Sequence, residues 1–128
     1  MKGVNIMEKE FTNDSIRFLE QGTEKAVISE AVNSEMTTIA LSGELSGEVA
    51  NTLLDEMTAL ILAGQGILID LDKTTYISAS VMEVFLRMEK LLEKNNKYMR
   101  ITNMTQTIYE DFKARGLHDL LEIEVKKQ

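Results

Sequence analysis

The stretch ILIDLDKTTYISASVMEVFL, residues 67–86, decides the fold of this chain. Its first part belongs to the run GILIDL at 66–71, which is short, apolar and rich in isoleucine, as is typical of a strand buried on both faces of a sheet. From residue 81 onward the apolar side chains recur at helical spacing. The polar segment 72–80 between them is predicted to be a loop. A strand, a loop and a helix in this order begin a strand–helix–strand unit.

The rest of the chain continues this alternation. An antiparallel hairpin is predicted from the alternating residues 26–31 and 37–41, joined by turn residues at Asn33 and Ser34. We therefore predict an α/β fold, with a mostly parallel β-sheet, an N-terminal antiparallel hairpin and right-handed strand–helix–strand crossovers. The further elements are a helix between a Ser46 cap and a Gly64 stop, a helix over 81–96, a strand over 98–102, a helix over 104–115 and a strand over 120–125.

The first 25 residues are predicted to be an extension placed before one domain at 26–128. They are mixed and polar, and only 13–20 has apolar residues at helical spacing. Asn13 is a suitable cap and Gly22 a suitable stop, so a short helix is expected there. A chain of 128 residues has room for one ordinary core but not for two.

Composition narrows the classes of partner. The formal net charge is −7, and no Lys or Arg cluster is present to neutralise a nucleic-acid backbone, so a protein partner is expected rather than nucleic acid or an anionic membrane. There is no cysteine, which excludes thiol catalysis and thiolate metal sites. No segment approaches a membrane span or a signal peptide, and a cytoplasmic location without membrane insertion is expected.

Two serines mark the predicted start of the helix that follows residue 80. Ser80 and Glu83 have the spacing of a capping box, so Ser80→Ala is expected to cost about 0.5–2 kcal/mol and Ser78 to be the cleaner residue for mutation. A phosphate on either hydroxyl would also be favoured by the positive end of the helix dipole. The sequence is therefore compatible with these serines acting as a helix cap or as a phosphorylation site.

Residues 26–125 resemble the STAS domains, named for sulfate transporters and anti-sigma factor antagonists. The resemblance rests on GEL at 43–45, on ILIDLDKTTYISAS at 67–80 and on the order of elements that follows. Such domains carry an Asp-Ser-Ser-Gly motif whose first serine is phosphorylated by an anti-sigma factor kinase. That motif falls on residues 78–81, Ser-Ala-Ser-Val, and its phosphorylated serine falls on Ala79. The resemblance thus implies either that Ser78 or Ser80 takes the phosphate or that this chain is not switched in that way.

The resemblance implies a non-catalytic module that regulates a sigma factor, and hence transcription, by docking on a kinase-like anti-sigma factor. The alternative is a STAS-like accessory subunit of a transporter or signalling assembly that is not phosphorylated. Neither function requires a cofactor. In both, the segment 72–80 and the following helix would bind the partner. The expected contact residues are Thr75, Tyr76, Ser78, Ala79, Ser80, Met82 and Glu83.

The other chemical side chains do not form a catalytic set. Asp70 is expected to be a polar strand end that binds loop amides, the competing hypothesis being a phosphoacceptor of the response-regulator type. That second role needs an acidic pair after an earlier strand, where only Glu44 is present. His118 is the single histidine and is expected in a loop near the last strand. No enzyme activity and no metal site are therefore predicted.

Overall fold

The computed structural model describes residues 7–127, and within them each strand pairs with the next strand in the chain. The elements are β1 (Met7–Phe11), β2 (Ser15–Glu20), β3 (Thr23–Val32), β4 (Met36–Leu45), α1 (Gly47–Leu62), β5 (Gly66–Ile77), α2 (Ala79–Lys94), β6 (Met99–Met104), α3 (Gln106–Ala114) and β7 (Ile123–Val125). Pairings from β1 to β4 are antiparallel, and those from β4 to β7 are parallel. The predicted α/β fold is confirmed as a mixed sheet with helices between its parallel strands.

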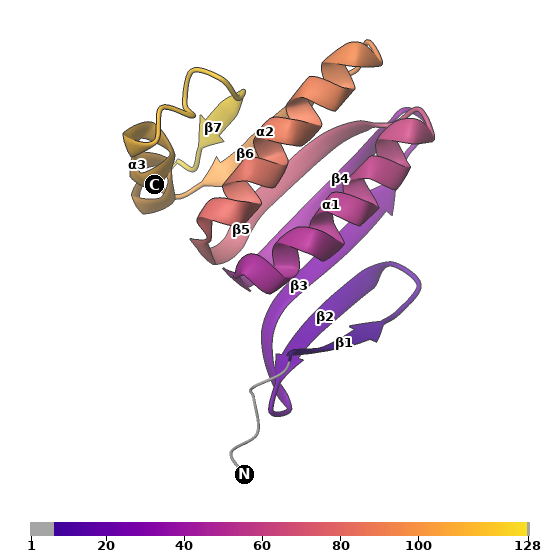
Figure 1. Ribbon diagram of the computed structural model, residues 1–128, viewed down its shortest axis with the longest axis vertical. Helices are drawn as coiled ribbons and strands as arrows, with labels where there is room; N and C mark the ends of the chain where they lie inside the picture. The colour runs from indigo at the N-terminus through magenta and orange to yellow at the C-terminus, as the bar shows by residue number, and fades with distance from the viewer. Residues whose placement is uncertain (1–6, 128) are drawn as a thin grey trace.

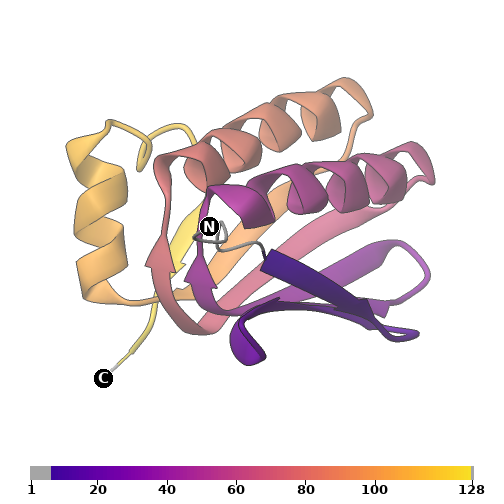
Figure 2. The ribbon, with the colours of Figure 1, turned by 60° about the horizontal axis from the view of Figure 1, so that its bottom comes forward.

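Helices α1 and α2 lie side by side on one face of the sheet (Figure 1). Each runs back along the sheet before the next parallel strand begins, as a crossover requires. Both helices therefore start at the same end of the sheet, beyond the carboxyl ends of β4 and β5. Figure 2 shows this helix layer stacked over the strands. In open α/β sheets, this carboxyl edge of the strands is where binding sites are usually found.

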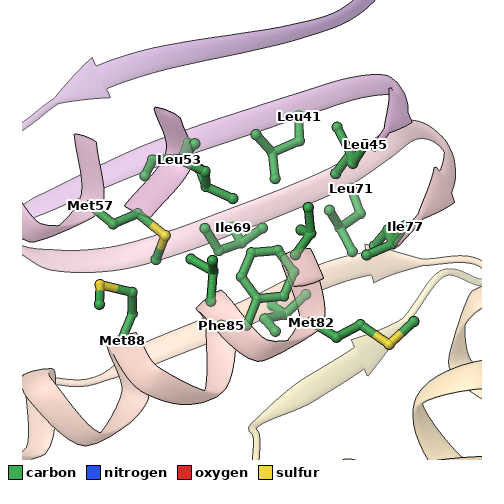
Figure 3. Close-up of a cluster of buried hydrophobic side chains, with 14 of the residues drawn as sticks. Leu41, Leu45, Leu53, Met57, Ile69, Leu71, Ile77, Met82, Phe85 and Met88 are labelled. Atoms are coloured by element: carbon green, nitrogen blue, oxygen red, sulfur yellow. The ribbon is translucent and has the colours of Figure 1, made fainter. Parts of the chain in front are cut away.

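The core lies between the sheet and the α1–α2 layer. Figure 3 shows side chains from α1, α2, β4 and β5 pointing toward one another there. On α2 the inward stripe includes both Val84 and Phe85, whereas Leu91 is only half-buried beside the fully buried Leu92. Phe85 also stacks on Phe112 of α3, with ring centroids 6.4 Å apart. This contact joins the helix layer to α3, on which Ile108 and Phe112 are buried.

The short helix predicted over 13–20 is wrong, because β2 occupies most of this segment. Ile16 and Phe18 alternate with a more exposed residue between them and face the core, which is the period of a strand. Ile16 and Leu19 also fit helical spacing, so the local pattern is ambiguous. Pairing with β1 on one side and with β3 on the other decides in favour of the strand.

Cross-strand contacts hold the N-terminal strands to the rest of the chain. Arg17 on β2 forms salt bridges of 2.7 Å with Glu10 on β1 and with Glu24 on β3. The Lys9 ammonium donates a 3.1 Å hydrogen bond to the Thr52 hydroxyl on α1. The described part of the predicted extension thus contains β1, β2 and the start of β3, while residues 1–6 lie outside the described residues.

The loop predicted over 72–80 is also wrong, because β5 continues to Ile77 and α2 begins at Ala79. Thr74 faces inward, and its hydroxyl donates a 2.7 Å hydrogen bond to the Leu41 carbonyl of β4. Ile77 is buried as well. These inward residues stand three apart because the β4–β5 pairing is irregular at two places, so simple alternation does not reveal the strand. Only Ser78 separates β5 from α2.

Candidate functional site

The ends of β4 and β5 and the first turns of α1 and α2 meet in one place, which we call the junction corner (residues 44–48 and 75–83). Leu45 and Ile77 are register partners in the parallel pairing. The Ser78 amide donates a 2.9 Å hydrogen bond to the Leu45 carbonyl, which fixes the two junctions against each other. The first turns of both helices are therefore held at fixed positions by backbone contacts.

Ser78 is the N-cap of α2. Its backbone is extended, with φ −73° and ψ 160°, and its hydroxyl accepts a hydrogen bond of 3.3 Å from the Val81 amide. A side-chain oxygen in this position satisfies one of the free amides of the first turn. Ser78 is half-buried, and its hydroxyl contacts both the Val81 amide and the Ser80 hydroxyl.

The predicted capping box of Ser80 and Glu83 is wrong, since the helix starts before Ser80. Ser80 lies inside the first turn and is exposed; its hydroxyl is 3.1 Å from that of Ser78. Glu83 is exposed, and its side chain makes no hydrogen bond with another described residue. A Ser-x-x-Glu spacing favours Ser80 as the cap, but the buried Ile77 ends the strand just before Ser78 and gives Ser78 the extended backbone of a cap.

Ala79 is the first residue of α2 and is exposed. It has no hydroxyl, so the exposed hydroxyl beside it is that of Ser80. A Cβ built on Gly47, the first residue of α1, would lie 3.3 Å from the Ser80 hydroxyl oxygen. Glycine at residue 47 thus allows the Ser80 hydroxyl to lie close against the N-terminus of the neighbouring helix.

The junction corner exposes most, but not all, of the predicted contact residues. Tyr76 is 53% exposed, although its neighbour Ile77 is buried. Met82 is 3% exposed and points into the core, so the expectation that it is open to a partner is wrong (Figure 3). Its place in the first turn suggested exposure, but it falls on the same helix face as Phe85. The exposed members are Thr75, Tyr76, Ala79, Ser80 and Glu83, with Ser78 half-buried.

Sequence reasoning missed the contribution of α1 to the corner. Glu44 at the end of β4 and Glu48 in the first turn of α1 are exposed beside Gly47. Parallel pairing of β4 with β5 brings these residues to the corner. The predicted strand–helix–strand crossover indicates this, because it places the starts of both helices at the same end of the sheet. Ser46 occupies the N-cap position of α1 as predicted, but its hydroxyl makes no cap hydrogen bond and is buried without a partner among the described residues.

Asp70 orders the backbone in the middle of β5. One of its carboxylate oxygens accepts hydrogen bonds from the Asp72 amide at 3.0 Å and from the Asn103 side-chain amide at 2.9 Å. Asp70 is not at the strand end, because β5 is longer than predicted. Its contacts match the expected role of a polar residue that binds nearby amides. No three His, Asp or Glu side chains come together as a metal site within residues 7–127.

A salt bridge joins β5 to the segment after β7. The Lys126 ammonium lies 2.7 Å from the Asp72 carboxylate and donates a 3.1 Å hydrogen bond to the Asp72 carbonyl. The hydrogen bond and charge of Lys126 lower the pKa of Asp72 below its ordinary value. This contact holds the C-terminal segment against the sheet.

His118 lies between α3 and β7, as predicted, and not at the junction corner. Its Nε2 is 3.5 Å from the Asp119 carboxylate, and its ring meets Tyr109 edge to face. Asp119 and Tyr109 form these contacts within the described residues 7–127. Within the same residues, no helix is long and apolar enough to cross a membrane.

Comparison with known proteins gives one family. The family model described as the STAS domain matches residues 27–128. No curated protein sequence matches the chain.

Solved structures that resemble the chain have low sequence identity. The phosphorylated form of the Bacillus cell fate determinant SpoIIAA has a TM-score of 0.62 and 19% identity, over 75% of this chain and 89% of that one. An anti-sigma factor antagonist from Mycobacterium paratuberculosis has a TM-score of 0.69 and 13% identity, over 78% and 86%. The murine anion transporter Slc26a9 has a TM-score of 0.52 and 8% identity, over 80% of this chain and 20% of that one. The fold is thus similar to those of proteins with different roles, among them an anti-sigma factor antagonist and an anion transporter.

Proposed function

Because the chain belongs to the STAS domain family, we propose that it is a non-catalytic regulatory module of the anti-sigma factor antagonist type. In this proposal it docks on a kinase-like anti-sigma factor through the junction corner. The observation that carries the proposal is the exposed, rigidly placed group around Tyr76, Ala79 and Ser80 at the carboxyl edge of the sheet. Exposed aromatic residues on a fixed scaffold are common centres of protein interfaces.

A binding titration with the kinase-like protein tests the docking surface. Tyr76→Ala should weaken binding at least tenfold, about 1.4 kcal/mol, if this ring anchors the interface. Tyr98→Ala is the matched control, because Tyr98 is 56% exposed but precedes β6 at the opposite edge of the sheet. Equal affinities of the two variants, or no binding by the unaltered chain where a standard antagonist binds, would refute the proposal.

The proposed phosphorylation site is Ser80, ahead of Ser78. Ser80 is exposed, whereas Ser78 is half-buried and its hydroxyl caps α2. A phosphate on Ser80 would lie in the first helical turn, where the helix dipole favours negative charge. Mass spectrometry after incubation with the kinase and ATP should find phosphate on Ser80, and Ser80→Ala should abolish it. Phosphate on Thr75 alone would contradict this assignment.

Ala79 favours a second candidate function, a STAS-like accessory subunit of a transporter or signalling assembly that is not phosphorylated. The residue that would carry the family phosphate has no hydroxyl here. The likeness of the fold to part of an anion transporter is compatible with this role. Neighbouring genes distinguish the two functions: an anti-sigma factor gene supports the first, and transporter genes support the second. The absence of phosphate on the chain after incubation with the kinase and ATP would also favour the second function.

A further inference from the structure

The outer sides of α1 and α2 leave a groove of about 710 Å³ between their C-terminal halves, away from the junction corner. Both helices begin at the carboxyl edge of the sheet, so these halves lie at the other end of the helix layer (Figure 1). Its lining residues are Leu54, Asp55, Thr58, Ala59 and Leu62 of α1, and Arg87, Met88, Lys90, Leu91 and Lys94 of α2. We call this surface the α1–α2 groove.

Apolar side chains form much of the groove. Leu62 is 69% exposed, and Leu54 and Leu91 are half-buried. On α1 the fully buried Leu53 and Met57 complete the core, and Leu54 lines the groove instead. The groove therefore presents a second apolar stripe on the outer side of the helix layer. Apolar grooves of this kind receive the apolar face of an amphipathic helix in known complexes.

One wall of the groove is positively charged. Arg87, Lys90 and Lys94 line it from α2, whereas Asp55 is the single carboxylate among the lining residues. None of the three cations forms an ion pair with another residue in the described part of the chain, and Arg87 does not pair with Glu83 one turn earlier. Such a group of free cations contrasts with the net charge of −7 of the chain as a whole.

We propose that the α1–α2 groove binds an amphipathic helical segment of another protein, with leucine-like residues on one face and acidic residues along its flank. The apolar stripe would bury the leucine-like residues, and the free cations of α2 would pair with the acidic residues. The groove spans residues 54–62 and 87–94, about two helical turns or roughly 13 Å along each helix. It would thus hold a short segment. This partner is additional to the one proposed for the junction corner.

An NMR titration of the isotope-labelled full chain tests the proposal with a defined probe. The probe is a peptide of about four helical turns with leucine at every third or fourth position and glutamate flanking them. A second peptide carries lysine at each glutamate position. The first peptide should shift amide signals of residues 54–62 and 87–94 and should bind about five- to tenfold more tightly than the second. Shifts confined to other surfaces, or equal binding of both peptides, would overturn the proposal.

Charge-reversal variants separate the groove from general electrostatic attraction. Lys90→Glu with Lys94→Glu should weaken the acidic peptide about five- to tenfold. Lys113→Glu with Lys127→Glu changes net charge equally, and Lys113 resembles Lys94 in lying in the last turn of its helix. This control pair should alter affinity less than twofold. Equal losses in the two pairs would show that the groove is not the site.

Leu62→Ser tests the apolar part of the groove, since Leu62 is exposed and its loss leaves the core intact. It should weaken the acidic peptide severalfold with an unchanged thermal unfolding midpoint. Sedimentation of the full chain, alone and with anionic vesicles, tests whether a second copy of the chain or a membrane occupies the groove instead. A dimer that Leu62→Ser converts to a monomer would assign the groove to a second copy of the chain, and binding to anionic vesicles that this variant abolishes would assign it to a membrane. Either result would overturn the proposal.

Discussion

Because Ser78 caps α2, Ser78→Ala should destabilise the chain and Ser80→Ala should not, whereas a Ser80 cap would give the reverse. Ser78→Ala removes the acceptor for the Val81 amide, and loss of a serine N-cap costs about 0.5–2 kcal/mol, typically about 1. The hydrogen bond is 3.3 Å long, so a value near or below 1 kcal/mol is expected. Ser80→Ala removes only an exposed hydroxyl contact and should change stability by less than about 0.5 kcal/mol.

Urea unfolding followed by circular dichroism measures this difference, because both variants should keep the same dependence on urea and shift only the midpoint. Ser78→Asp is the matched control, as aspartate is also a good N-cap and should restore most of the lost stability. A Ser80→Ala variant destabilised as much as Ser78→Ala would refute the assignment of Ser78 as the cap. If the assignment holds, Ser80 is the cleaner residue for binding and phosphorylation experiments.

Three further predictions concern the body of the fold. Burial, together with a hydrogen bond and repulsion from Glu56, raises the pKa of Glu30 from 4.5 to about 7, so folding stability should fall as pH rises across this interval. Glu30→Gln should flatten that dependence in thermal melts at pH 5 to 8, and an unchanged slope would contradict it. Gly43→Ala should destabilise the chain by more than about 2 kcal/mol, because φ is +82° and the new Cβ would collide with the Lys25 carbonyl oxygen of β3. A urea unfolding midpoint equal to that of the unaltered chain would contradict this backbone conformation. Phe85→Ala should cost about 3–5 kcal/mol in urea unfolding, since the ring is fully buried and stacked on Phe112, and a loss below about 1 kcal/mol would contradict this packing.

The strands and helices that periodicity identified are those whose inward residues repeat regularly. The strand at 66–71 and the stripe through Val81, Phe85 and Met88 give clear periods and were predicted correctly. Burial of that strand on both faces was wrong, because Leu68 and Asp70 are only half-buried. Thr74 was read as part of a loop, although its hydroxyl bonds to β4 and it lies in a strand. The irregular register between β4 and β5 depends on contacts between distant residues, and these leave no local pattern in the sequence.

Prediction of the N-terminal strands from the sequence fails for a different reason. Ile16, Phe18 and Leu19 are compatible with a strand and with a helix, so the local sequence does not decide. The decision comes from partners on either side, of which the Arg17 salt bridges to Glu10 and Glu24 are the clearest. Those partners are identifiable only after the strands have been paired. An edge hairpin of this kind is therefore harder to predict than the central strands.

The candidate site was proposed from the family resemblance, and the geometry distinguishes between its two serines. The resemblance directs attention to residues 78–81, and alanine at residue 79 leaves the two neighbouring serines as alternatives. The geometry distinguishes them, because one hydroxyl caps the helix and the other is exposed beside Gly47. A phosphate on Ser80 would meet the N-termini of α1 and α2 together, each favourable by about 0.3–1 kcal/mol, but also the exposed Glu48 and Glu83. Since these terms oppose each other, the added charge would act mainly on a docked partner rather than on the stability of the chain.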